Sequence, residues 1–210
     1  MNLGTICDEI SYLVNDTTLS STGMNADRTK AWVREVLFLD IYTLCTDWWF
    51  LKDTGTISTV NGTSVYSLPN QVPNAKNLRE VYINGSNKMQ GISSFEATDL
   101  TGSSTGEPTK FWHYDRSSGT DRIKFYPTPD AVYTVNVTGI TTPSSLTDDD
   151  DEPTLPSEWH YLLVKGGVVK ALKHNQDPNL EVEMAEYQAA LKRLCAQNNR
   201  DDYRTDSWWK

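Results

Sequence analysis

Apolar residues recur at intervals of three and four over the first quarter of the chain, and this period predicts helices. Leu3, Ile6, Ile10 and Leu13 place a short amphipathic helix over about residues 2–15. A polar run then leads to Asn25, which suits the N-cap of a longer helix. The expected apolar stripes of this second helix are Val33, Leu37, Ile41, Leu44 and Trp48, and beside them Trp32, Val36 and Leu39. Two stripes indicate a helix that is packed on more than one side.

From Lys52 onward the period changes to two, which predicts strands. Residues 56–60 and 63–68 flank Asn61-Gly62, a dipeptide whose two residues tolerate positive φ. We therefore expect a β-hairpin at this point of the chain.

Further strands are expected on both sides of a second Asn-Gly turn, and they continue to about residue 140. Their ranges are 78–83, 88–92, 110–114, 122–126 and 132–140. In the last range Tyr133, Val135 and Val137 alternate with polar residues, which is typical of a half-buried antiparallel strand. About six to eight strands in roughly 90 residues predict a small sandwich or barrel.

Helical periodicity returns at Pro156-Ser157 and predicts two more helices. The third helix is apolar nearly all round and contains Gly166-Gly167, which is costly in a helix interior unless another backbone or helix passes close by. Asp177-Pro178 ends it and caps the fourth helix. The seam of the fourth helix is Leu180, Met184, Tyr187, Leu191 and Leu194. The last two helices should pack as a hairpin against the first two.

These patterns predict an α+β protein in which an antiparallel β module is inserted into a discontinuous bundle of about four helices. The expected parts are N-terminal helices, β module, acidic linker, C-terminal helical hairpin and extended C-terminal tail, at residues 1–51, 52–143, 144–156, 157–198 and 199–210. With 210 residues, such a chain can bury a core without disulfides or structural metals.

The acidic linker carries much of the negative charge of the chain. The net charge is −9, from 19 Lys and Arg against 28 Asp and Glu, and much of the excess is in the acidic loop formed by Asp148, Asp149, Asp150, Asp151 and Glu152. Adjacent carboxylates repel one another, so a solvated, flexible connector is expected. Calcium binding and an acidic interface that faces a basic partner or repels DNA stay open, although the ligand spacing and turn glycine of an EF-hand are missing. No basic patch argues for tight DNA binding.

The sequence contains no recognisable catalytic, cofactor-binding or metal-binding motif, so an enzyme is not expected. His113, His160 and His174 lack a partner spacing suited to zinc, and His160 is expected to be structural. Cys7, Cys45 and Cys195 are interpreted as isolated, buried free thiols. A pair of carboxylates that converge only in the fold remains possible.

The N-terminal segment lacks the features of a signal peptide, and no apolar run is long enough to span a membrane. We therefore expect synthesis in the cytosol and no membrane partner.

Aromatic residues suggest contacts at two places. Trp48, Trp49 and Phe50 close the second helix and are expected to plug its junction with the next region, or alternatively to form a ligand platform. The C-terminal tail carries candidate docking residues for a partner: Tyr203, Arg204, Trp208, Trp209 and Lys210. Packing of this tail back onto its own subunit is the other interpretation.

The order of several short elements resembles the neck adaptor proteins of tailed bacteriophages, which connect head to tail. These elements are the W-W-F-L end at residues 48–51, Y-S-L-P at 66–69, the Y-P-x-P-D turn at 126–130, and the acidic segment S-L-T-D-D-D-D-E-P-T-L-P-S-E-W-H at 145–160 that runs into an apolar helix. The resemblance is one of layout and spacing and covers most of the chain.

The resemblance implies a structural virion protein in the neck, assembled in the host cytoplasm. It implies a homo-oligomeric ring, commonly of twelve copies, that surrounds the DNA channel, binds the portal protein through its C-terminus and meets a tail or nozzle protein. Genomic DNA would pass without specific binding, and no cofactor is implied. A carbohydrate-binding or tail-fibre-type structural module is the alternative.

Overall fold

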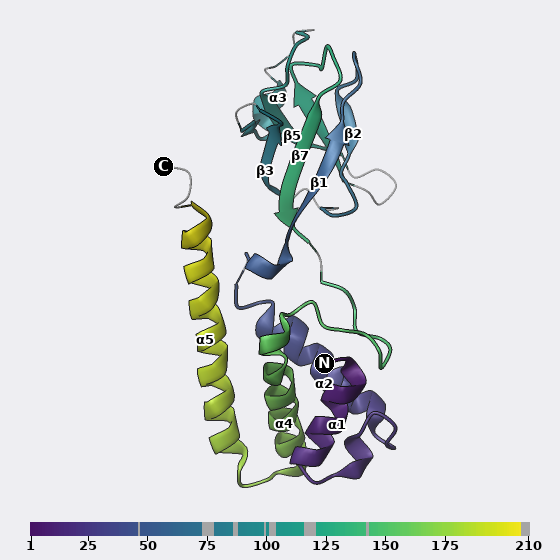
Figure 1. Ribbon diagram of the computed structural model, residues 1–210, viewed down its shortest axis with the longest axis vertical. Coiled ribbons are helices and arrows are strands. Elements are labelled where there is room, and N and C mark those ends of the chain that lie inside the picture. The colour runs from purple at the N-terminus through teal and green to yellow at the C-terminus, as the bar shows by residue number, and fades with distance from the viewer. Residues whose placement is uncertain are drawn as a thin grey trace. The chain divides into compact units, whose positions relative to one another are not determined.

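The computed structural model divides the chain into two compact units (Figure 1). The helical unit comprises Met1–Phe50 and Pro143–Lys210, and the β unit comprises Leu51–Thr142. The structure describes residues 1–45, 47–72, 78–85, 88–98, 100, 104–115, 121–141 and 143–206. The α+β class and the antiparallel character expected from the sequence are confirmed, and the strands form two sheets rather than a closed barrel.

Four α-helices build the helical unit: α1 (Leu3–Leu13), α2 (Ala26–Glu35), α4 (Tyr161–Asn175) and α5 (Leu180–Asp206). Short turns accompany them: η1 (Thr17–Leu19), η2 (Val36–Ile41), η3 (Trp49–Leu51), whose last residue begins the β unit, and η6 (Ser157–Trp159). In α1 the Asn2 side chain accepts a hydrogen bond from the Thr5 N–H at 2.9 Å and so caps the first turn. No helix among the described residues is long and apolar enough to cross a membrane.

Helix α4 is the centre of this unit, in contact with α1, α2 and α5 (Figure 1). A Cβ atom built on Gly166 would lie 2.6 Å from Cγ1 of Val36, and one on Gly167 would lie 2.2 Å from Cδ1 of Ile10. A larger residue at either position would therefore collide with Val36 or Ile10, and these side chains would have to shift. The expectation that another helix passes close to the two glycines is confirmed.

Helix α5 extends well beyond its predicted end. At 27 residues it is about 40 Å long, whereas the 15 residues of α4 span about 22 Å. Residues 199–206, expected to be an extended tail, continue the helix, so that prediction was wrong for this part of the chain. Once a long helix is nucleated each further residue adds one hydrogen bond, which sustains it through sequence that lacks an apolar period.

Two sheets form the β unit. One has the order β1 (Lys52–Ser58), β7 (Thr134–Ile140), β3 (Leu78–Ile83), and the other has the order β2 (Val65–Ser67), β6 (Arg122–Tyr126), β5 (Lys110–Asp115), β4 (Gln90–Gly91). All neighbouring strands are antiparallel except β4 and β5. A short helix, α3 (Ser94–Thr98), follows β4.

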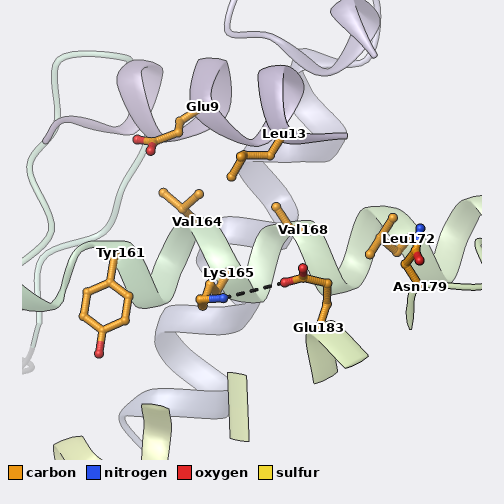
Figure 2. A pocket seen from close by; sticks show the side chains of 9 residues that line it. All are labelled: Glu9, Leu13, Tyr161, Val164, Lys165, Val168, Leu172, Asn179 and Glu183. Carbon is orange, nitrogen blue, oxygen red and sulfur yellow. Dashed lines mark ion pairs between the residues drawn. The ribbon is translucent and has the colours of Figure 1, made fainter. Parts of the chain in front are cut away.

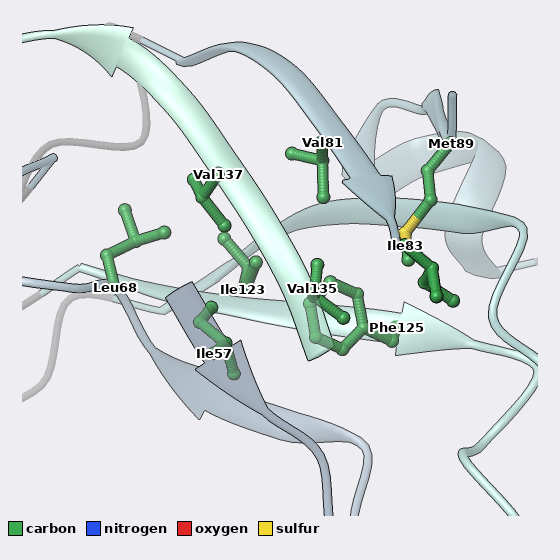
Figure 3. Packing of buried hydrophobic residues seen from close by; sticks show 9 residues of the cluster. All are labelled: Ile57, Leu68, Val81, Ile83, Met89, Ile123, Phe125, Val135 and Val137. Carbon is green, nitrogen blue, oxygen red and sulfur yellow. The ribbon is translucent and has the colours of Figure 1, made fainter. Parts of the chain in front are cut away.

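Side chains from both sheets meet in one apolar core (Figure 3). The cluster is Ile57, Leu68, Val81, Ile83, Met89, Ile123, Phe125, Val135 and Val137. Val135 and Val137 are completely buried and alternate with more exposed residues along β7, which confirms the predicted period of two.

The hairpin predicted around Asn61-Gly62 does not form. Gly62 has the expected positive φ of 79°, but β1 pairs with β7 and β2 pairs with β6 in the other sheet. The turn therefore carries the chain from one sheet to the other. The dipeptide determines the local backbone conformation, whereas the strand partners are determined by which side chains reach the shared core.

Candidate assembly surfaces

The three histidines occupy separate places in the described structure. His160 is buried, and its Nε2 lies 2.7 Å from the Leu155 carbonyl oxygen. Burial lowers the pKa of His160, which favours a neutral ring that donates to this carbonyl. His174 lies beside Arg28, and His113 is in β5. His160 therefore has the structural role expected from the sequence, and the described residues hold no cluster of three metal-ligating side chains.

The acidic loop packs on the helical unit. The carbonyl oxygens of Asp149 and Asp151 accept hydrogen bonds from the N–H groups of Gly4 and Leu3, both at 2.9 Å. These two donors lie in the first turn of α1, where N–H groups have no partner within the helix. The prediction of a flexible connector was wrong for this part of the loop, because the loop caps a helix.

Side chains of α2 hold the same loop from the other side. Lys30 Nζ lies 2.7 Å from Asp149 Oδ1, and this ion pair raises the pKa of Lys30. Arg34 donates hydrogen bonds to the carbonyl oxygens of Leu146 and Thr147. The loop is therefore attached to α2 as well as to α1.

Within the loop, one carboxylate organises the backbone. Asp151 Oδ2 accepts from the N–H groups of Thr147, at 2.6 Å, and Asp148, at 2.8 Å, and these bonds lower the pKa of Asp151. The remaining acidic residues, Asp148, Asp150 and Glu152, are exposed. They are the part of the loop that is available to a partner.

The aromatic residues at the end of the second helix form an internal cluster. Trp48 is only 1% exposed and stacks on Phe50 with ring centroids 5.3 Å apart, and Trp49 meets Phe50 edge to face at 4.9 Å. The three rings contact one another within the helical unit, and their role as a plug at the junction with the next region stays a prediction. Because Trp48 is buried, it is not available as a ligand platform.

The predicted docking residues of the tail are only partly within the described structure. Tyr203 and Arg204 belong to the last turns of α5. Trp208, Trp209 and Lys210 lie outside the described residues. Their role in docking stays a prediction.

One groove, here called the Leu13 groove, runs between α1, α4 and the beginning of α5 (Figure 2). Its volume is about 380 Å³, and its lining includes Leu13, Tyr161, Val164, Lys165, Val168 and Glu183. Lys165 Nζ lies 3.7 Å from a Glu183 carboxylate oxygen and 2.6 Å from one of Glu186. Ion pairs therefore join α4 and α5 at the rim of this groove.

A second groove, the Leu44 groove, lies on the other side of the contact between α4 and α5. It is lined by Leu39, Leu44, Val169, Met184, Tyr187 and Leu191, among others, with a volume of about 380 Å³, and it continues towards Cys195 and Ala196. Leu39 is 60% exposed, Leu44 46% and Met184 36%. Such an apolar rim is unusual on a surface that meets only water.

Leu39 and Leu44 were expected to be buried in the stripes of the second helix, and this prediction was wrong. The cause is η2, a π-helical turn in which the N–H of Tyr42 donates to the carbonyl of Leu37 at 3.0 Å. A π turn contains one residue more than an α turn, so the side chains within it and after it depart from the α-helical phase. Sequence periodicity does not reveal where such a turn occurs.

One contact of α5 was not visible in the sequence. The buried Asn198 side chain accepts from the Trp49 N–H at 3.1 Å and donates to the Asp47 carbonyl at 3.1 Å. These two bonds join the far half of α5 to the residues that follow η2.

The two neighbouring aromatic residues of β5 differ in exposure, since Trp112 is largely hidden and Tyr114 is 49% exposed. Trp112 is 8% exposed, and Lys124 Nζ lies 5.5 Å from the ring centroids of both Trp112 and Tyr114. Each of these cation–π contacts occupies one face of a ring on which a sugar could otherwise stack.

Comparison with known proteins identifies a family that matches this chain. The family model described as SU10 adaptor protein matches residues 1–207, which is nearly the whole chain. No curated protein matches this chain.

Proposed function

The chain belongs to the SU10 adaptor protein family, structural adaptors of bacteriophage virions, and from this premise we propose that it joins the portal to the tail in the phage neck. The proposed assembly is a ring of copies, twelve in number, around the DNA channel. Copies would be made and assembled in the host cytoplasm. The observation that carries this proposal is the Leu44 groove, because Leu39, Leu44 and Met184 form an exposed apolar surface on the helical unit.

We infer that a neighbouring copy covers the Leu44 groove. Obligate homo-oligomer interfaces resemble a protein core, and an apolar groove with exposed leucines has that composition. Charged residues at its rim, including Lys173 and Lys192, would remain near solvent and meet acidic surface of the neighbour in a chain whose net charge is −9.

Two further contacts are part of the proposal. The C-terminal residues Tyr203 to Lys210 would dock on the portal protein, and the remaining surface would meet a tail or nozzle protein. The exposed carboxylates of Asp148, Asp150 and Glu152 support a channel that DNA traverses without specific binding, since like charges repel the phosphate backbone.

The test is native mass spectrometry of the full chain, alone and with the portal protein. We expect a ring for the wild type, either alone or with the portal. The double variant Leu44→Arg and Met184→Arg should reduce the ring population by about tenfold or more, because it places unpaired charges in an apolar interface. A chain truncated after Asp202 should form the ring but lose portal attachment.

Val132→Arg is the matched control, since Val132 is 74% exposed in the β unit, outside the groove. Circular dichroism would verify that each variant is folded. A wild-type chain that stays a monomer with the portal present would refute the ring, and a double variant that assembles normally would exclude the Leu44 groove as the interface.

A further inference from the structure

Two of the three cysteines face each other across the helical unit. Cys45 Sγ and Cys195 Sγ are 3.8 Å apart although the residues are separated by 150 positions in the chain, and both are reduced cysteines of intermediate exposure. The expectation of isolated, buried thiols was therefore wrong for this pair. It was correct for Cys7, which is completely buried.

The separation of the two sulfurs is close to that needed for a disulfide. A disulfide has an S–S distance of about 2.05 Å, so the two atoms must approach by about 1.8 Å. Rotation about a single χ1 moves an Sγ atom by more than this amount. Cys195 is on α5, whereas Cys45 lies outside regular helix and strand, so one partner is not confined to helical rotamers.

Neighbouring hydrogen bonds keep Cys45 and Cys195 close to each other. Asn198 lies one helical turn after Cys195 and therefore on the same side of α5. Its two hydrogen bonds, to the main chain of Asp47 and Trp49, fix the segment beside Cys45 against that side of the helix. The thiols therefore approach each other where the backbone is already anchored.

We propose that Cys45 and Cys195 form an intramolecular disulfide once the virion has left the reducing host cytosol. The timing rests on the proposed virion location, because disulfides persist in oxidising surroundings such as virion surfaces. The oxidant is a low-molecular-weight disulfide. One cysteine thiolate attacks it and releases one small thiol, and the second cysteine attacks the resulting mixed disulfide and releases the other. Two protein thiols are thus oxidised, and one small disulfide is reduced to two thiols.

The crosslink would covalently join α5 to the segment through which the chain leaves the helical unit. Phe50, the last residue of this part of the unit, is five positions after Cys45. Helix α5 is longer than α4 and extends past it. There, the C-terminal half of α5 is held by contacts such as those of Asn198. A disulfide would make this attachment permanent after release, whereas the reduced form would rely on hydrogen bonds.

The experiment is a redox titration of the purified full chain with glutathione and glutathione disulfide. Peptide mapping by mass spectrometry without reduction should find a Cys45–Cys195 crosslink, and the free thiol count should fall from three to one. The melting temperature of the oxidised protein should be higher by about 5–10 °C. Burial raises the pKa of the Cys7 thiol to about 11, so this residue should stay unmodified and serve as an internal control.

Cys45→Ser and Cys195→Ser should each abolish the crosslink and the rise in melting temperature, whereas Cys7→Ala should keep both. Two thiols that stay free when the small disulfide is in large excess would overturn the proposal, as would a bond between two copies in place of the internal one. The crosslink is detected in a single chain, so its failure is distinguishable from a failure of ring assembly or portal binding.

Discussion

Helices α4 and α5 are consecutive in the chain, but they bury very different fractions of their residues. In α4, nine of 15 residues are buried, whereas in the part of α5 whose side chains are described, Leu180 to Asn198, the buried residues are Tyr187, Ala190, Leu194 and Asn198. α4 contacts three helices, and the glycine pair allows two of these close approaches. α5 contacts mainly α4 and presents most of its surface outward.

The difference separates two roles within one hairpin. A helix buried on nearly all sides contributes to stability through packing, and little of it can be recognised by a partner. A long helix with one narrow buried face contributes less to the fold but offers surface for assembly. We therefore attribute the stability of the helical unit mainly to α4, whereas α5 and the rim of the Leu44 groove carry the proposed intermolecular contacts.

The largest expected effect comes from truncating an apolar side chain in α4. Leu162 is completely buried, so Leu162→Ala should lower the free energy of unfolding by about 2–5 kcal/mol. Val182 on α5 is 62% exposed, and Val182→Ala should change the free energy of unfolding by less than about 0.5 kcal/mol. Urea denaturation followed by circular dichroism would measure both variants. Equal losses of unfolding free energy in the two variants would contradict the different contributions of α4 and α5 to stability.

A loss of stability of intermediate size is expected when the Asn198 contacts of α5 are removed. Asn198→Ala leaves the Trp49 N–H and the Asp47 carbonyl without this side chain as partner, which should cost about 1–3 kcal/mol. Hydrogen exchange should show faster exchange at Trp49 and in the far half of α5. Arg193→Ala, at an exposed position of the same helix, is the control and should leave both unchanged. Unaltered exchange in the Asn198 variant would mean that α5 is held by other contacts.

The smallest effect concerns the ion pairs between the two helices. The hydrogen bond from Lys165 lowers the pKa of Glu186, so the pair stabilises the fold above the ordinary pKa of a glutamate. This contribution is lost as the pH falls through the lowered pKa of the folded state. The melting temperature of Glu186→Gln should therefore be slightly below that of the wild type at neutral pH, and the difference should shrink as the pH falls below the ordinary pKa of a glutamate and also in high salt. A difference that persists at low pH would attribute the effect to packing.

Local patterns predicted the element types well, because the apolar period reports which face of a helix or strand is buried. Gly166-Gly167 even predicted a close helix contact, since glycine destabilises a helix interior and is favoured there where a neighbouring helix leaves no room for a Cβ atom. Asn61-Gly62 predicted a turn but not its strand partners, because pairing with β6 and β7 depends on residues about 60 to 80 positions away.

The candidate surfaces were harder to predict, for reasons that are also physical. The acidic loop caps α1 through main-chain carbonyl oxygens, which are the same in every residue type, so its four aspartates indicated only repulsion. The approach of Cys45 to Cys195 and the bonds of Asn198 join segments about 150 residues apart. The π turn rotated Leu39 and Leu44 out of the phase that an α-helix would give them.

The two ends of the β unit lie next to each other. Lys52 pairs with Ile140, and the Thr141 N–H donates to the Leu51 carbonyl at 2.8 Å, so the chain enters and leaves this unit at nearly the same point. An insertion with adjacent ends can be lengthened, shortened or exchanged while the host segments keep their own separation. One helical unit can thus carry β modules that differ in length or sequence between Leu51 and Thr141 while its own two segments keep their positions.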